Sequence, residues 1–149
     1  MDEIYMSEAL KEARKAFDED EVPIGAVIVH KGRIVARGHN QVERLKDATA
    51  HAEMLALTSA ASYLGAKWLS GASIYVTIEP CPMCAGALVL ARVKNLYFGA
   101  KDPKAGACGS VANIVNHKKL NHRVEVKGGI SEKECGLLLK EFFKKKRIK

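Results

Sequence analysis

The spacing of apolar residues changes twice in the first third of the chain. Apolar positions recur with a helical period over residues 4–17, which predicts an amphipathic first helix. Two apolar runs joined by Lys31-Gly32 then predict a β-hairpin over residues 26–37. Residues 40–48 are polar and are predicted to form a loop. The chain therefore opens with a helix followed by two paired strands.

Strand-like and helix-like segments alternate over the rest of the chain. Strands are predicted over residues 73–78, 95–99 and 124–126, where β-branched and aromatic side chains predominate. Helices are predicted over residues 50–64 and 82–92, over a short stretch near 111–115, and from a capping box at 131–134 to the end. Strands that alternate with helices after an initial hairpin predict an α/β layered domain with a partly parallel sheet.

Length and composition agree with one folded domain. The chain has 149 residues, 48% hydrophobic and 28% charged, and it shows no internal repeat and no linker rich in Ser or Gly, so residues 1–149 are predicted to form a single domain. No apolar run approaches the roughly 18 residues of a membrane span, and the first residues do not resemble a signal peptide. We therefore expect a cytoplasmic protein with no membrane partner.

The charge is uneven along the chain. The net charge is +7, yet residues 1–21 hold eight acidic and only three basic residues. The basic excess lies in the remainder and culminates in Lys144, Lys145, Lys146 and Arg147. Such an excess is typical of proteins that bind nucleic acid, although a solvated, solubilising surface explains it equally well.

Two of the four cysteines are three positions apart at a predicted helix start. In a cytoplasmic chain, Cys81 and Cys84 point to metal or thiol chemistry before disulfides. Together with the imidazole of His51 they make a three-ligand set that suits tetrahedral zinc and leaves one position for water. Cys108 or Cys135 could in principle supply a fourth ligand, which would make the site structural instead.

Glu53 lies two residues after His51 and is not needed as a ligand. Its position suits a general acid/base, which takes a proton from the metal-bound water and returns it to a leaving group. Residues two apart point about 200° from each other inside a helix. His51 and Glu53 can therefore share a site only if His51 occupies the irregular first turn.

The complete pattern, H-x-E followed after 26 residues by P-C-x-x-C, is the signature of zinc deaminases. Over nearly its whole length the chain resembles the bacterial TadA-type tRNA adenosine deaminases. The segments that carry the resemblance are residues 21–27, 38–40, 49–53, 79–87, 98–102, 106–110, 121–122 and 134–135.

The resemblance implies a fold, a reaction and a set of site residues. The fold is a three-layer cytidine deaminase-like α/β fold of the CMP/dCMP-type deaminase domain, with a mixed, mostly parallel sheet of about five strands and helices on both faces. The reaction is hydrolytic deamination of the wobble adenosine to inosine in the tRNA anticodon loop, in a homodimer with one Zn²⁺ per subunit and no organic cofactor. The residues implied are His51, Cys81 and Cys84 for zinc, Glu53 for proton transfer, Asn40 and Asp102 for the adenosine, and Asn121 and His122 for the anticodon loop.

Two other functions compete with this hypothesis. The P-C-P-M-C segment is also similar to guanine deaminases, so a free guanine or cytidine-type deaminase is one alternative. A non-catalytic RNA-binding zinc subunit is another, although such a subunit has no use for Glu53. Residues 98–110 and 121–135 resemble the tRNA enzymes, and the basic tail favours phosphate contact. Cys108 stands where relatives usually have a smaller residue, and a buried thiol explains it.

Overall fold

The computed structural model describes residues 1–148, and the backbone alone of Ile148. Five strands form one sheet in the order β2-β1-β3-β4-β5. β1 pairs antiparallel with both β2 and β3, while β3–β4 and β4–β5 are parallel. The strands are β1 (Gly25–His30), β2 (Arg33–His39), β3 (Ser73–Ile78), β4 (Asn95–Ala100) and β5 (Glu125–Lys127).

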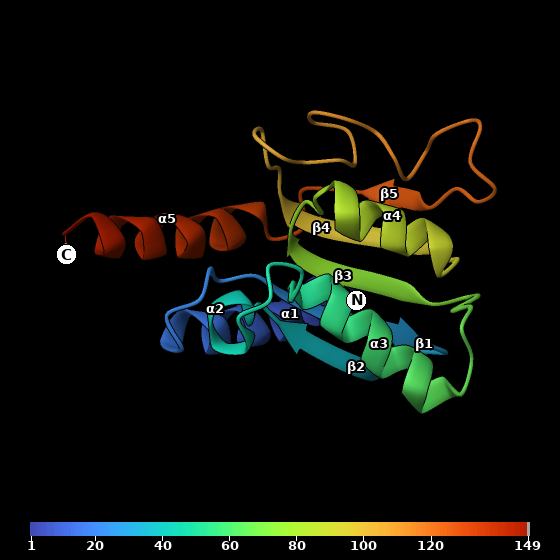
Figure 1. The fold of residues 1–149 in the computed structure, drawn as a ribbon, viewed down its shortest axis with the longest axis horizontal. Helices are drawn as coiled ribbons and strands as arrows, with labels where there is room; N and C mark the ends of the chain where they lie inside the picture. Colours follow the sequence, from blue (N-terminus) through green and yellow to red (C-terminus); the bar gives the residue numbers. More distant parts are fainter. Residues whose placement is uncertain (149) are drawn as a thin grey trace.

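Helices cover both faces of this sheet. α3 and α4 lie in front of it in the view of Figure 1, and α1 lies behind it. α5 packs on β4 and β3 and then extends past the edge of the sheet (Figure 1). The helices are α1 (Asp2–Asp18), α2 (Val42–Leu45), α3 (Ala52–Leu64), α4 (Pro82–Leu90) and α5 (Glu132–Ile148).

The two faces are built from alternate residues of the same strands. Ile28, Ile74 and Val76 are buried against α3 and α4, whereas Val27 and Tyr75 are buried against α1 and α5. This alternation is the period-two geometry of a strand covered on both sides, and it explains why β1 and β3 are apolar at nearly every position. The predicted mixed sheet with helices on both faces is confirmed.

The parallel pair β3–β4 determines where a site can form. The register pairs Val76 with Phe98 and Ile78 with Ala100, so both strands end at the same edge of the sheet. α4 begins at this edge directly after β3. In open α/β sheets, ligands bind at the carboxyl ends of the strands, where chain segments diverge.

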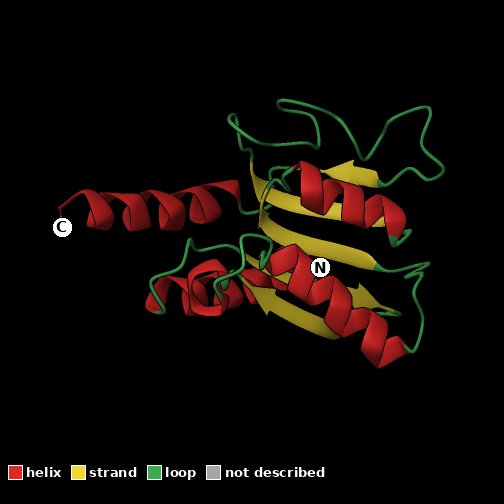
Figure 2. Cartoon of the chain, viewed as in Figure 1, coloured by secondary structure: helices red, strands yellow, loops and turns green. Residues whose placement is uncertain are grey.

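Two local predictions were wrong. Residues 111–115 form bends and an isolated bridge between Cys108 and Asn113 instead of a short helix, and Figure 2 shows this part of the chain as loop. The polar segment 40–48 contains the single-turn helix α2, which sequence patterning did not indicate. Within the described residues, no helix is long and apolar enough to cross a membrane.

Candidate metal and catalytic site

His51, Cys81 and Cys84 meet at the carboxyl edge of the sheet. Their ligand atoms all lie within 4.8 Å of one another. The Nδ1 atom of His51 is 3.6 Å from each of the two Sγ atoms. The sequence prediction that these three side chains share one site agrees with this placement.

The spacing of these three atoms fits a tetrahedral zinc ion. With Zn–N and Zn–S bonds of about 2.0 and 2.3 Å at a tetrahedral angle, the nitrogen and each sulfur should be roughly 3.6 Å apart. One imidazole and two thiols also form a donor set that zinc prefers. Cys108 and Cys135 are buried outside this group, and no fourth His, Cys or carboxylate joins it within residues 1–148.

His51 lies outside the regular helix. It is the N-cap of α3, with an extended backbone at φ −79 and ψ 152. The imidazole and the Glu53 carboxyl can therefore converge, as the sequence argument required. Gly38 of β2 permits this arrangement because a Cβ there would collide with the carbonyl oxygen of Ala52. The first turn of α3 is thus packed directly on the β2 backbone.

Cys81 and Cys84 belong to the first turn of α4. Cys81 is the N-cap and Pro82 occupies the first helical position, where its missing N–H is not needed. A hydrogen bond from the Cys84 thiol, helped by backbone N–H groups of Cys84 and Met83, lowers the pKa of Cys81 to about 5. The same hydrogen bond raises the pKa of Cys84. Within this pair the first thiolate therefore forms at Cys81, where backbone N–H groups of the helix N-terminus also stabilise it.

Glu53 is a buried carboxyl beside this group. Its side chain is 3% exposed, and its Oε1 atom has no hydrogen-bond partner in the described part of the chain. Burial raises the pKa of Glu53 to about 7. A carboxyl that gains and loses a proton near neutral pH is suited to general acid/base catalysis.

Asn40 lies next to the histidine ligand and is 6% exposed. The N–H of the following residue, Gln41, donates to the carbonyl of Ala50, which directly precedes His51. The Oδ1 atom of Asn40 finds no hydrogen-bond partner among residues 1–148. A buried amide oxygen without a hydrogen-bond partner is destabilising, and a donor group of a bound ligand would relieve this cost.

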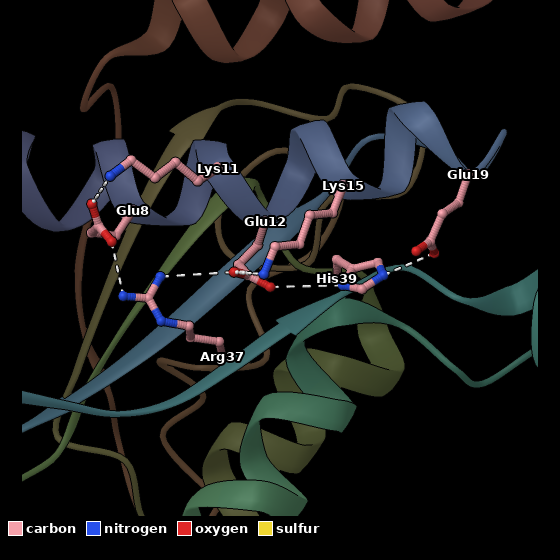
Figure 3. A network of polar contacts seen from close by, with 7 residues as sticks. All are labelled: Glu8, Lys11, Glu12, Lys15, Glu19, Arg37 and His39. Atoms are coloured by element: carbon pink, nitrogen blue, oxygen red, sulfur yellow. Dashed lines mark hydrogen bonds and ion pairs between the residues drawn. The ribbon is translucent and has the colours of Figure 1, made fainter.

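The residue before Asn40 is held by α1. His39 Nε2 lies 3.0 Å from the Glu19 carboxylate, and His39 Nδ1 lies 3.7 Å from Glu12. Arg37 continues the network to Glu12 and Glu8 (Figure 3). The carboxyl end of β2, and with it Asn40, is therefore tied to the first helix.

Asp102 follows the end of β4 and lines a cavity of about 380 Å³ with Ile24, Ile78 and Phe143 among its walls. Its Oδ1 atom accepts the N–H groups of Lys104 and Ala105 at 3.0 and 3.1 Å. Asp102 thus lies on the same edge of the sheet as the metal group. The predicted adenosine contacts, Asn40 and Asp102, approach that edge from different strands.

Asn121 and His122 lie elsewhere. They line a groove with Trp68, Leu90 and Leu120, and His122 Nε2 is 2.7 Å from the carbonyl of Val93. This groove adjoins the C-terminal end of α4, whereas Cys81 and Cys84 are at its N-terminal end. The fold of one chain does not bring this pair to the metal group.

The basic tail lies on the exposed side of α5. Lys144, Lys145, Lys146 and Arg147 are all exposed, and Lys146 pairs with Asp20 at 2.7 Å. Phe142 is buried and its neighbour Phe143 is half exposed, as is usual for adjacent positions on a helix that packs on one side. Lys149, also part of the predicted basic tail, lies outside the described residues.

Two buried glutamates near the site were not singled out from sequence. Glu21 accepts the backbone N–H groups of Glu43 and Arg44 at 3.0 and 2.8 Å. Glu79 accepts hydrogen bonds from the loop that carries Asp102. An acid directly after an apolar strand was the available signal for Glu79, but its partners are 23 or more residues away.

Comparisons with known proteins agree on a deaminase. A family model described as MafB19-like deaminase matches residues 1–147. A tRNA-specific adenosine deaminase of Bacillus subtilis is 52% identical over 148 residues, which cover 99% of this chain and 92% of the relative.

Solved structures give the same result. One from a study of A-to-I editing by tRNA:A34 deaminases at the wobble position of transfer RNA superposes with a TM-score of 0.87 and 46% identity, covering 90% of this chain and 97% of its own. A guanine deaminase from Nitrosomonas europaea is more distant, with a TM-score of 0.79 and 26% identity over 94% of this chain and 83% of its own.

Proposed function

Because the chain belongs to the family of tRNA-specific adenosine deaminases, we propose that it hydrolyses the wobble adenosine of a tRNA anticodon loop to inosine and ammonia. The observation that carries this proposal is the buried carboxyl of Glu53, whose Oε1 atom has no hydrogen-bond partner among residues 1–148, beside the His51, Cys81 and Cys84 group. A structural metal site has no use for such a group, whereas hydrolytic deamination requires a proton carrier there.

The metal of the proposed reaction is zinc, one ion per chain, held by His51 Nδ1 and by the Sγ atoms of Cys81 and Cys84. The 3.6 Å separations support this assignment. A bound zinc ion supplies the Lewis acidity that makes water a nucleophile near neutral pH. No organic cofactor is part of the proposal.

Glu53 carries the protons of the reaction. Its carboxylate takes a proton from the attacking water and delivers it to N1 of the adenine ring while the water oxygen bonds to C6. It then transfers the second water proton to the exocyclic amino group, the C6–N bond breaks, and ammonia leaves. Burial raises the pKa of Glu53, which suits a carboxyl that both accepts and releases a proton.

The base itself must leave the loop stack to reach this site. Single-stranded anticodon loops permit this at low cost, because their bases are already unpaired. The unpartnered Oδ1 of Asn40 supplies an acceptor for the flipped nucleotide. Asp102, which follows β4 at the same edge of the sheet, is the second proposed contact, and its carboxylate is proposed to bind the ribose.

A basic groove supports RNA rather than a free base as the substrate. Lys140, Lys146 and Arg147 surround Phe143 in a groove of α5. This groove shares Lys104, Leu139 and Phe143 with the cavity that contains Asp102. A path of basic side chains around an aromatic ring suits a single-stranded backbone with stacked bases. The proposed tRNA contacts in the tail are Lys144, Lys145, Lys146 and Arg147.

A second copy of the chain is the proposed partner at the groove that contains Asn121 and His122. Trp68, Leu90 and Leu120 are exposed there, an unusual cluster of large apolar side chains for a free surface. Sedimentation velocity should show a dimer, and Leu90→Asp should yield monomers. Leu45→Asp, at an equally apolar exposed site on α2, is the matched control that should stay dimeric.

The central experiment is a parallel assay of the zinc-loaded protein. Unmodified anticodon stem-loops with adenosine at the wobble position are scored for inosine, and free guanine and cytidine are scored for ammonia. Inosine in the stem-loops supports the proposal. Turnover of guanine or cytidine alone would make the chain a small-molecule deaminase, and RNA binding without turnover would make it a non-catalytic subunit. A tRNA substrate supports the proposed cytoplasmic location.

A further inference from the structure

Glu79 is a buried carboxylate at the junction of the metal group and the loop over residues 102–110. It is 3% exposed and lies two residues before Cys81. Its Oε1 atom accepts the backbone N–H of Asp102 at 3.0 Å and the hydroxyl of Ser110. Its Oε2 atom accepts the backbone N–H groups of Cys108 and Ser110, both at 3.0 Å. All four hydrogen bonds come from this one loop.

The loop is also held by local backbone hydrogen bonds: the carbonyl of Asp102 accepts the N–H of Gly106, and the carbonyl of Ala107 accepts that of Ile114, both at 2.9 Å. Apart from the single bridge between Cys108 and Asn113, residues 101–110 contain no regular secondary structure. The neighbouring Pro80 adds one hydrogen bond, since its carbonyl accepts the N–H of Ala107 at 2.9 Å. Gly106 lets the loop wrap closely, because a Cβ at this position would collide with the Glu79 carboxyl. The loop therefore folds around the side chain of Glu79, the residue that directly follows β3.

This arrangement couples two parts of the site mechanically. The segment that carries Glu79 continues within two residues into the Cys81 ligand, and the N–H of Asp102 is bonded to Glu79 directly. The Glu79 carboxylate is thus a direct anchor between the backbone of Asp102 and the segment that carries Cys81, in addition to the hydrogen bond from Gly106 N–H to the Asp102 carbonyl. Both carboxylate oxygens of Glu79 are occupied by the four donors of the loop. Glu79 belongs neither to the group of candidate metal ligands nor to the lining of the cavity that contains Asp102.

We propose that Glu79 is a positioning residue for substrate binding, which holds Asp102 at a fixed place beside the metal group through the backbone of the 102–110 loop. The proposal rests on the proposed function in one respect, namely that Asp102 contacts the flipped nucleotide. It adds a role for a residue that touches no substrate.

Glu79→Gln tests the proposal with little change in volume. Its amide has one oxygen and one NH₂ group. The Ser110 hydroxyl can rotate and accept a hydrogen bond from that NH₂ group, so the amide nitrogen should take the place of Oε1. The N–H of Asp102 then faces a second donor and loses its acceptor. The variant should therefore release Asp102 while it keeps the bonds to Cys108 and Ser110. We expect KM for the stem-loop to rise about tenfold or more, with less effect on kcat and with zinc content unchanged.

A double-mutant cycle separates positioning from a general structural role. In an Asp102→Asn background, which keeps the Oδ1 acceptor for Lys104 and Ala105, Glu79→Gln should change KM by less than about twofold, because coupled residues give non-additive effects. Ser110→Ala removes a different partner of Glu79 and is the control that should leave KM nearly unchanged. Equal effects of Glu79→Gln in both backgrounds would overturn the proposal.

Amide hydrogen exchange gives a reading that needs no substrate. In Glu79→Gln the Asp102 amide should exchange faster than in the parent protein, while the Cys108 amide stays protected. Unchanged protection of Asp102 contradicts the proposed anchor. If the parent protein is inactive on stem-loops but Asp102 loses protection, the anchor stands and the proposed function fails, so the two failures are distinguishable.

Discussion

The Glu21 carboxylate accepts the backbone N–H of Arg44 at 2.8 Å across 23 positions of sequence. Its other oxygen accepts the N–H of Glu43. These are donors at the N-terminus of α2, which carries no side-chain cap of its own. A buried residue at the end of α1 therefore serves as the N-terminal acceptor for a helix that follows β2.

Glu21→Ala should destabilise the protein by about 1–3 kcal/mol, because two partly buried N–H groups lose their acceptor. Urea unfolding followed by circular dichroism measures the change. Glu43→Gln removes the same charge from an exposed position of α2 and should leave the midpoint nearly unchanged. Identical midpoints for both variants would show that the two hydrogen bonds contribute nothing net.

Glu53→Gln should abolish turnover while the metal stays bound. The amide keeps the size of the side chain but cannot carry a proton, so the rate on stem-loops should fall at least about 100-fold. Single-turnover kinetics measures the loss, and elemental analysis of the same preparation measures zinc. A variant that keeps more than a few per cent of the activity, an order-of-magnitude threshold, would remove Glu53 from its proposed role.

Cys84→Ser should lower zinc content well below one ion per chain, because a hydroxyl is a far poorer zinc ligand than a thiolate. Cys108→Ser is the matched control, since Cys108 is also buried but lies outside the His51, Cys81 and Cys84 group. Inductively coupled plasma spectrometry compares the two. Equal zinc loss in both variants would point to a general loss of folding rather than to a ligand.

The double variant Lys144→Ala, Arg147→Ala should weaken binding of stem-loop RNA and flatten its salt dependence. Lys145 and Lys146 are retained because they contact Phe17 and Asp20. Two lost phosphate contacts should reduce the slope of log K against log salt by about 1.4. Fluorescence anisotropy from low to moderate salt measures it.

Lys31→Ala, Arg33→Ala is the control for this charge change. These residues flank the β1–β2 turn, at the edge of the sheet opposite the metal group, and the RNA slope should not change. If both double variants flatten the slope equally, the tail holds no specific RNA contact.

Stability should decline in alkaline solution for a reason that can be traced to Tyr75. Burial, together with the hydrogen bond that its hydroxyl donates to Asp2 at 2.7 Å, raises the pKa of Tyr75 well above its usual value. In the unfolded chain this phenol ionises near pH 10. The native state therefore retains a proton that the unfolded state loses, and the stabilisation is complete below about pH 10 and declines above it.

Tyr75→Phe should thus show a shallower loss of unfolding free energy from pH 10 upward than the parent protein. Urea midpoints at a series of alkaline pH values give this slope. Tyr63→Phe, at an exposed position on α3, is the control and should follow the parent. A Tyr75→Phe slope equal to that of the parent would mean that the buried phenol does not contribute.

The parts that sequence predicted well are those with local causes. The strand at 73–78 is correct to the residue because its β-branched run is bounded by Gly71 and Pro80. The grouping of His51, Cys81 and Cys84 followed from the ligand types and from the signature spacing. The requirement that His51 lie outside the regular helix was also deduced, and its N-cap geometry meets that requirement.

The parts that were missed have distant causes. α2 depends on Glu21, which no local window around residues 42–45 contains. The segment 111–115 follows Gly109, whose φ of 135 no helix allows, and it leads from a loop that is bonded to Glu79. The carboxylate of Glu21 supplies the acceptors for α2, whereas the N–H groups of Val111 and Ile114 bond to carbonyls of the loop that Glu79 holds. Local periodicity holds no information about either arrangement.

The N-caps His51 and Cys81 imply a simple charge balance at the site. Two thiolates would balance both charges of a bound zinc ion, and an ionised Glu53 would bring the net charge of these groups to −1. The amino ends of α3 and α4 both point there, each equivalent to about half a positive elementary charge. The backbone of these two helices would therefore add positive potential at the site, which offsets part of the negative charge of the thiolates and of Glu53.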